Sequence, residues 1–219
     1  MPGVAPGRVL VLGGGVVGYN MLRALNSLGY EAVLILQLWL KHGPAGMAKK
    51  ILFVGGEVHS AGLDISTAGR DVAVLFGDGA AAVCLEGIET SENVGILAHS
   101  LHAQGKYADQ LFVEGQSFRR WPSIRNEMLE EGRQYPKMEG SAVFKHATRR
   151  MPEAAAEVME KANLKVEDID LMIPHQANLR IIESVAKYAG ISMDRVMLTV
   201  QKYGNMSAAT VPVALVEAL

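Results

Sequence analysis

Two polar residues near the end of the chain have the types and spacing that oxyanion chemistry needs. His175 lies in "IPHQANLRI", just after a short apolar run, and Asn205 follows thirty residues later in "YGNMSAAT". An imidazole N–H and a carboxamide N–H that meet in space can both donate to a developing negative oxygen. The simpler reading of His175 is a strand-end histidine with its own hydrogen bonds, and that of Asn205 is a turn residue.

An oxyanion pair serves a nucleophile or a carbanion, so the next question is which residue supplies it. The sequence has one cysteine, Cys84, in "AAAVCLEG". Free cysteine on an apolar strand is among the most buried residue types. We therefore expect Cys84 to be a small buried side chain away from the site. One cysteine also excludes an internal disulfide framework and a thiolate metal cluster.

The bulk composition favours an ordinary enzyme subunit. The 219 residues are 49% hydrophobic and 20% charged, which is typical of a globular protein with a real core. The net charge of −2 comes without a basic block, so we expect no nucleic-acid partner. The longest apolar run, at 32–40, is too short to cross a membrane, and we expect a cytoplasmic protein with no membrane partner.

The elements that must position these residues alternate between strands and helices. Apolar runs predict strands, and Phe144, Met151 and Val158 recur at helical spacing within the longest predicted helix. This alternation favours an α/β fold in which helices pack on one mixed sheet. The predicted strands lie near 50–55, 72–76, 81–86, 95–102, 169–173 and 196–200, and the predicted helices at 141–162 and 178–189.

The first 46 residues form a separate unit in this reading. "RVLVL" at 8–12 predicts a strand, a glycine-rich turn and a helix follow, and "EAVLIL" predicts a second strand. Residues 1–36 resemble the NAD-binding start of alanine dehydrogenases, although Gln37 stands near the place where an acid would bind ribose. A plain glycine-rich turn is the alternative. The glycines with G-x-G-x-x-G spacing, which would bind a nucleotide, are Gly13, Gly15 and Gly18.

Five motifs carry a second resemblance, over residues 46–219. In order they are "GMAKKILFVGGEVHS", "GRDVAVLFGDGAAAV", "MEGSAVFKHA", "PHQANLRI" and "YGNMSAATVP". Together they resemble the second half of a β-ketoacyl-ACP synthase III, a condensing enzyme with a thiolase-like layered α/β fold. The resemblance implies that 47–219 is a thiolase-type C-terminal domain truncated at its C-terminal end. Residues 1–46 are then a Rossmann-like βαβ start, either native or foreign to it.

The resemblance also implies roles for the oxyanion pair. The family joins an acyl-CoA to malonyl-ACP by decarboxylative condensation at the start of fatty acid synthesis. His175 and Asn205 match the donors that stabilise the enolate, within about 6 Å of one another. A donor imidazole must be neutral, so its pKa should lie at or below that of free histidine. The family's nucleophilic cysteine has no counterpart upstream of the "EVHS" segment, which predicts impaired activity.

Binding roles follow from the same resemblance. It implies CoA thioester and malonyl-ACP substrates, no cofactor and no metal, with acyl carrier protein and acyl-CoA as partners of a homodimer. Surface charge or core packing is the alternative for each residue. The implied contacts are Arg70 with the CoA adenine, Phe144 and Asn178 with the pantetheine arm, and Lys145 and Arg180 with the carrier protein.

Two other functions remain open at this point. One is a non-catalytic thiolase-fold subunit that binds CoA or carrier protein. The other is an NAD-binding dehydrogenase fragment, which residues 1–37 would represent.

Overall fold

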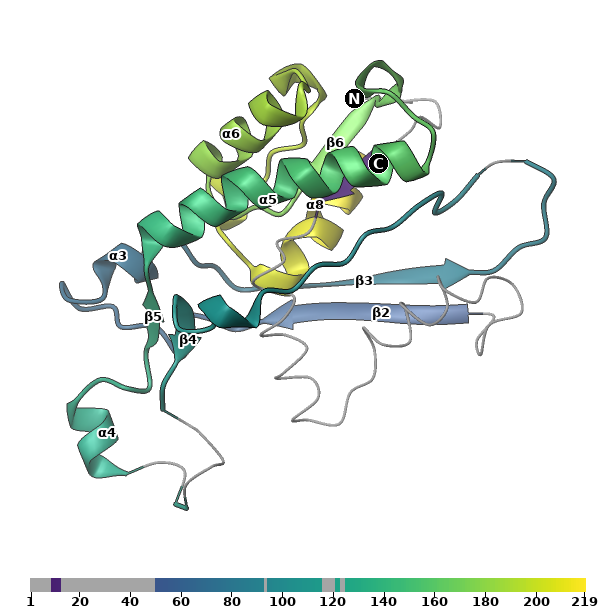
Figure 1. Cartoon of the computed structure of the whole chain (residues 1–219). Coiled ribbons are helices and arrows are strands. Elements are labelled where there is room, and N and C mark those ends of the chain that lie inside the picture. The colour runs from purple at the N-terminus through teal and green to yellow at the C-terminus, as the bar shows by residue number, and fades with distance from the viewer. Residues whose placement is uncertain (1–8, 13–49, 93, 116–120, 123–124) are drawn as a thin grey trace.

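The computed structural model describes residues 9–12, 50–92, 94–115, 121–122 and 125–219 (Figure 1). The nucleotide-binding prediction for Gly13, Gly15 and Gly18, and the strand predicted at 31–36, lie outside these residues.

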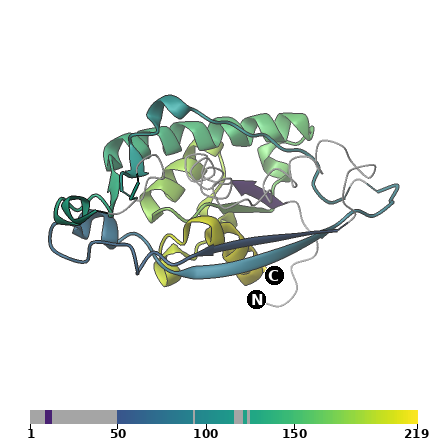
Figure 2. The same cartoon turned by 90° about the horizontal axis from the view of Figure 1, so that it is seen from below.

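The described elements stack in layers. Helices α5 and α6 pack side by side above a parallel strand pair, β1–β6, and a long antiparallel ribbon, β2–β3, lies on the far side (Figures 1 and 2). Helix α8 contacts both β6 and β3, so it separates the two sheets. This order of helix, sheet, helix and sheet is the layered α/β arrangement predicted from the sequence.

The bounds of the elements show where the layers come from in the chain. The helices are α3 (Arg70–Ala73), α4 (Asn126–Glu130), α5 (Gly140–Lys161), α6 (Leu179–Ala189), α7 (Val200–Tyr203) and α8 (Thr210–Ala218). Short 3-10 turns are η2 (Gly105–Tyr107), η3 (Val166–Asp168), η4 (Met193–Arg195) and η5 (Ser207–Ala209). The strands are β1 (Val9–Leu12), β2 (Lys50–Glu57), β3 (Gly79–Glu86), β4 (Leu111–Val113), β5 (Pro136–Met138) and β6 (Leu171–Pro174).

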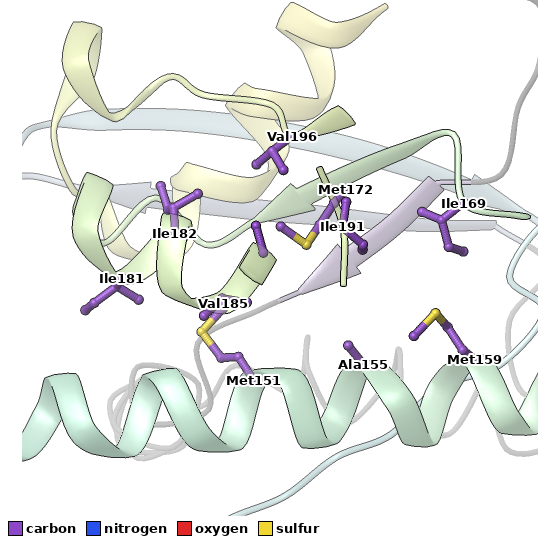
Figure 3. Packing of buried hydrophobic residues seen from close by; sticks show 11 residues of the cluster. Met151, Ala155, Met159, Ile169, Met172, Ile181, Ile182, Val185, Ile191 and Val196 are labelled. Carbon is purple, nitrogen blue, oxygen red and sulfur yellow. The ribbon is translucent and has the colours of Figure 1, made fainter. Parts of the chain in front are cut away.

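The core lies between α5, α6 and β6. Ile182 and Val185 on α6 are fully buried and face Met172 of β6, and Met151 and Ala155 approach from α5 (Figure 3). Fully burying one such aliphatic side chain contributes about 1.5–3 kcal/mol. This cluster holds the end of β6, and therefore the start of the candidate site, in place.

Both long helices were predicted to within one or two residues. Helix α5 begins at Gly140 without a side-chain cap, one residue before the predicted Ser141. Helix α6 is capped by Asn178, whose Oδ1 accepts the Ile181 N–H at 3.0 Å, and Gly190 ends it with φ 74°.

The inward face of α6 does not begin with its first residue. Leu179 is 46% exposed, whereas Ile181 is 3% exposed and belongs to the core.

Two predicted strands are absent from the described residues, and both predictions were wrong. Residues 72–76 begin inside α3, because the Val72 and Ala73 N–H groups bond to the Gly69 carbonyl in a helical turn. Residues 95–102 form no ladder. Residues 99 and 102 form hydrogen bonds with side chains of α5 instead. Lys161 Nζ donates to the His99 carbonyl at 3.4 Å, and Glu157 Oε2 lies 2.6 Å from His102 Nε2.

The expected single mixed sheet is also a correction, because the described strands form three separate pairs. The strand predicted at 196–200 has one bridge, Val196 with Met172, before the chain turns into α7. Strand β1 pairs in parallel with β6, so residues 9–12 share a sheet with the C-terminal part. None of the helices in the described residues has the length and apolar character needed to span a membrane.

Candidate active site

His175 is the first residue after β6, and it lies in the interior because this end of the strand is buried. The side chain is 5% exposed, and burial lowers the pKa of His175 to about 4. A buried site disfavours the charged imidazolium, so the ring is neutral at pH 7. The direction of this shift agrees with the pKa expected for an N–H donor.

The Gln176 side chain holds the backbone beside His175 in place through hydrogen bonds to residue 174 and to residues 197–200. Its Nε2 donates to the carbonyls of Pro174 at 2.8 Å and Met197 at 3.1 Å, and its Oε1 accepts the N–H groups of Thr199 and Val200. Gln176 is fully buried and all four bonds are to backbone. These bonds turn the chain away from the sheet at 199, which explains why 196–200 is not a strand. Sequence reasoning gave Gln176 no role.

Asn205 is held from both sides by the backbone that follows α3. Its N–H donates to the Leu75 carbonyl at 2.8 Å, and its own carbonyl accepts the Gly77 N–H at 3.1 Å. The side-chain Oδ1 accepts the Ser207 N–H at 2.9 Å. Because Oδ1 is engaged, the Nδ2 group of Asn205 is the end available as a donor.

A chain of hydrogen bonds connects the two candidates. His175 Nδ1 lies 2.6 Å from Thr210 Oγ1, and Thr210 Oγ1 lies 2.8 Å from the Ser207 carbonyl. The Ser207 N–H completes the connection to Asn205. The structure thus brings both residues into one buried network, and their approach to within about 6 Å stays a prediction.

A second histidine, His59, joins this network from the loop after β2. A carbonyl can only accept, so His59 Nδ1 donates to Gly77 at 2.8 Å, and Nε2 lies 3.1 Å from Ser207 Oγ. The His59 ring also packs at a tilt against the Phe76 ring, with 4.8 Å between the ring centroids. Sequence reasoning included His59 in the "EVHS" motif without a role. A histidine a few residues after a predicted strand was the available signal.

The ribbon packs closely against this network at two glycines, once against backbone and once against a side chain. A Cβ at Gly55 would lie 2.7 Å from the Ala208 carbonyl oxygen, and one at Gly79 would lie 2.2 Å from Met206 Sδ. Real Cβ atoms essentially never approach so closely. Glycine at 55 and 79 therefore lets η5 and the residue after Asn205 sit directly on β2 and β3.

Asn178 borders a groove of about 330 Å³ beside the turn that carries Asn205. The Oδ1 atom of Asn178 already caps α6, which leaves its Nδ2 for a ligand. Phe144 lies outside this lining, on α5, and is 38% exposed. The lining is mainly apolar and consists of Val74, Leu75, Ala177, Asn178, Leu179, Leu198, Val200, Gln201 and Gly204.

The three predicted basic contacts are on the surface. Arg70 starts α3 with a side chain 72% exposed, and its Nε lies 3.7 Å from Asp71 Oδ1. Lys145 on α5 and Arg180 on α6 are exposed. The described residues contain no group of three or more His, Cys, Asp and Glu side chains that could hold a metal ion.

The predicted burial of Cys84 was wrong, because this residue is exposed. Cys84 pairs with Leu52 across the ribbon, and residues along β3 alternate between half-buried and exposed. Gly55 and its partner Ala81 share the face that meets η5, so Cys84 points to the opposite face. The thiol is therefore separated from His175 by the ribbon itself.

Comparison with known proteins supports the resemblance seen in the motifs. Residues 159–219 match the family "3-Oxoacyl-[acyl-carrier-protein (ACP)] synthase III C terminal", and residues 32–105 match "3-Oxoacyl-[acyl-carrier-protein (ACP)] synthase III". The second match begins upstream of the expected start at residue 46. The resemblance of residues 1–36 to alanine dehydrogenases finds no support in these matches.

Relatives give the same answer. A β-ketoacyl-[acyl-carrier-protein] synthase III of Cereibacter sphaeroides is 43% identical over 174 residues, which are 78% of this chain and 50% of the relative. The chain thus spans about half the length of the curated relatives it matches.

Solved structures of synthase III enzymes share the fold. The Aquifex aeolicus enzyme aligns with a TM-score of 0.68 and 36% identity over 85% of this chain and 53% of its own. The Thermus thermophilus enzyme aligns with a TM-score of 0.71 and 32% identity over 97% of this chain and 68% of its own. With the ordered motifs and the layered thiolase-like fold, these matches show that the chain belongs to the β-ketoacyl-[acyl-carrier-protein] synthase III family.

Proposed function

We propose that this chain carries the decarboxylation site of a β-ketoacyl-ACP synthase III-type acyltransferase. The observation that carries the proposal is the buried network in which a neutral His175 and an oriented Asn205 are joined through Thr210 and Ser207. Two N–H donors fixed in a water-poor site stabilise negative charge better than water does, because they need no reorganisation when the charge develops.

The reaction that such a pair assists is the loss of carbon dioxide from a malonyl thioester. The bond between the carboxylate and the α-carbon breaks, and its electron pair passes to the α-carbon and the thioester oxygen. His175 and Asn205 donate to that oxygen. Without an acyl acceptor, a proton from water then gives the acetyl thioester. In the complete family reaction the same carbanion would attack an acyl-cysteine.

The substrate would reach the network through the groove at Asn178. An apolar groove with one amide donor suits the pantetheine arm, whose amide carbonyls are acceptors. A contact of this arm with Phe144 rests on the resemblance alone, because Phe144 lies outside the groove. Arg70, Lys145 and Arg180 are exposed positive charges that suit the CoA nucleotide and an acidic carrier protein. We also infer a homodimer, which rests on the resemblance alone, and a cytoplasmic location, which rests on the composition of the chain.

The direct test measures carbon dioxide released from malonyl-CoA by the full chain. His175→Ala and Asn205→Ala should each lower the rate on the order of 10²–10³-fold, since each removes one donor. His102→Ala is the matched control, because the His102 side chain is 62% exposed and pairs with Glu157 of α5 rather than with the network. Equal rates for His175→Ala and the unchanged chain would refute the proposal.

The position of Cys84 favours one alternative, a subunit that binds CoA or carrier protein without covalent chemistry. The only thiol of the sequence points away from the network. Malonyl-CoA that binds in calorimetry but releases no carbon dioxide would support this alternative over catalysis.

A further inference from the structure

Four hydrogen bonds form a closed ring that contains Asn205. His59 Nδ1 donates to the Gly77 carbonyl at 2.8 Å, and the Gly77 N–H donates to the Asn205 carbonyl at 3.1 Å. The Ser207 N–H donates to Asn205 Oδ1 at 2.9 Å, and Ser207 Oγ lies 3.1 Å from His59 Nε2. His59 therefore connects the turn before β3 with the turn that carries Asn205.

The atoms of His59 determine the direction of both of its bonds. A carbonyl only accepts, so Nδ1 carries the hydrogen in the bond to Gly77. A neutral imidazole has one N–H, which leaves Nε2 as an acceptor, and the Ser207 hydroxyl is the donor to it. Glu57 Oε2 is 3.9 Å from Nε2, which is too far for a hydrogen bond. Each nitrogen of the ring thus has one partner in the network.

Ser207 needs support from outside its own turn, because its backbone is strained. Its φ of 45° lies in the left-handed region, which is costly for a residue with a side chain. Such a conformation persists only where surrounding contacts hold it. The bond from Ser207 Oγ to His59 is a contact of this kind, and it comes from a distant segment of the chain. The Ser207 N–H in turn holds the carboxamide of Asn205 through Oδ1.

The His59 ring is itself held in place. Its side chain is 19% exposed, and it packs against Phe76, whose backbone forms a parallel bridge with Asn205. The neighbouring Ser60 binds the Asp78 carboxylate through both its N–H and its hydroxyl. These bonds fasten the loop after β2 to the turn before β3, so His59 has a fixed base from which to hold Ser207.

We propose that His59 is a positioning residue for Asn205. It holds Ser207 in the left-handed conformation, and Ser207 then fixes the Asn205 carboxamide by its Oδ1, which leaves Nδ2 as the end that donates. His59 acts through Asn205 and does not touch the reacting atoms. The importance of this support for decarboxylation rests on the proposed function, whereas the ring of hydrogen bonds does not.

The first test measures the ring of hydrogen bonds in the full chain without any substrate. His59→Phe keeps an aromatic ring against Phe76 but removes both hydrogen bonds, so the Ser207 N–H should exchange with solvent about tenfold faster by NMR. Ser207→Ala removes the same bond from the other side and should have the same effect at residue 207. The Ile181 N–H at the cap of α6 should be unchanged in both variants. Unchanged exchange at residue 207 in either variant would overturn the proposal.

The second test asks whether His59 acts through Asn205. His59→Phe should lower kcat for carbon dioxide release from malonyl-CoA on the order of tenfold with KM unchanged, because His59 does not line the groove. In an Asn205→Ala background the same substitution should have no further effect, since nothing remains to be positioned. Additive losses would overturn the proposal. The matched control is His102→Phe, whose side chain is 62% exposed and which should change neither kcat nor exchange.

The two proposals can fail separately. Faster exchange at residue 207 in His59→Phe, together with no carbon dioxide from the unchanged chain, would support the positioning role and refute the proposed function. Carbon dioxide release that depends on His175 and Asn205, together with unchanged exchange and unchanged kcat in His59→Phe, would support the proposed function and refute the positioning role.

Discussion

The face of α6 that packs on β6 and the outer face of the β2–β3 ribbon contain similar apolar residues in opposite environments. Ile182 and Val185 are completely buried, whereas Leu52 and Val54 are 65% and 58% exposed. Both regions come from regular apolar patterns in the sequence. An apolar pattern therefore predicts which side of an element is apolar. Whether that side is buried depends on a second element that covers it.

The largest difference between the two regions should appear in stability. Ile182→Ala removes side-chain volume from a closed core and should lower the free energy of unfolding by about 2–5 kcal/mol. Val54→Ala on the open ribbon should change it by less than about 0.5 kcal/mol. Urea unfolding followed by circular dichroism measures both. A loss at Val54 as large as that at Ile182 would mean that the ribbon face is covered in solution.

Acid should destabilise the buried region through His175. The folded pKa of about 4 lies below the value of 6.5 for a free histidine, so the unfolded chain binds the proton first. Stability is therefore fully present above pH 6.5, declines as the pH falls toward 4, and loses about 3 kcal/mol in total.

A titration of unfolding free energy against pH checks this effect. His175→Gln should flatten the decline between pH 6.5 and 4. A decline that persists unchanged in His175→Gln would locate its cause elsewhere.

The cap of α6 provides a smaller effect at the edge of the buried region. Asn178→Ala removes the bond to the Ile181 N–H and should lower the unfolding free energy by about 1 kcal/mol. Asn178→Asp keeps a capping oxygen and should retain the stability, but it removes the amide donor from the groove. Malonyl-CoA binding that survives in Asn178→Asp would exclude Asn178 as a ligand donor.

The smallest stability effect is expected at Cys84, where chemical reactivity gives the sharper measurement. Cys84→Ser should change the unfolding free energy by less than about 0.5 kcal/mol, since the side chain is exposed. A thiol reagent should label Cys84 in the native chain nearly as fast as in urea. Slow labelling in the native chain would show that this face is covered.

Mass spectrometry after incubation with acetyl-CoA extends the test to catalysis. We expect no acetyl group on Cys84 and no condensation with malonyl-ACP by this chain alone, because the thiol lies on the opposite face from the network. An acetylated Cys84 that goes on to form ketoacyl product would contradict both expectations.

The two long helices could be predicted because their signals are local. Helical spacing, the Asn178 cap and the Gly190 stop fix α6 without reference to the rest of the chain. His175 and Asn205 were chosen from ordered motifs spread along the chain, and hydrogen bonds through Thr210 and Ser207 connect them. Their role as oxyanion donors stays a prediction.

The failures share a non-local cause. The apolar run at 72–76 has strand composition, yet whether it forms a ladder depends on a partner that its own residues do not specify. At 196–200 the side chain of Gln176, more than twenty residues away, takes the two N–H groups that a strand would need. His59 and Thr210 were missed for the same reason, since their partners come from distant segments.

The close packing of the ribbon on η5 has a consequence for how this protein tolerates variation. On one strand, Val54 should accept many residues, while Gly55 beside it should accept almost none, because any side chain there would displace Ala208 and the turn that carries Asn205. A complete substitution scan of β2 and β3 would show alternating permissive and intolerant positions. Natural variation along this ribbon would then be restricted at the positions that pack on the turn carrying Asn205, although the ribbon contributes no residue to the oxyanion pair.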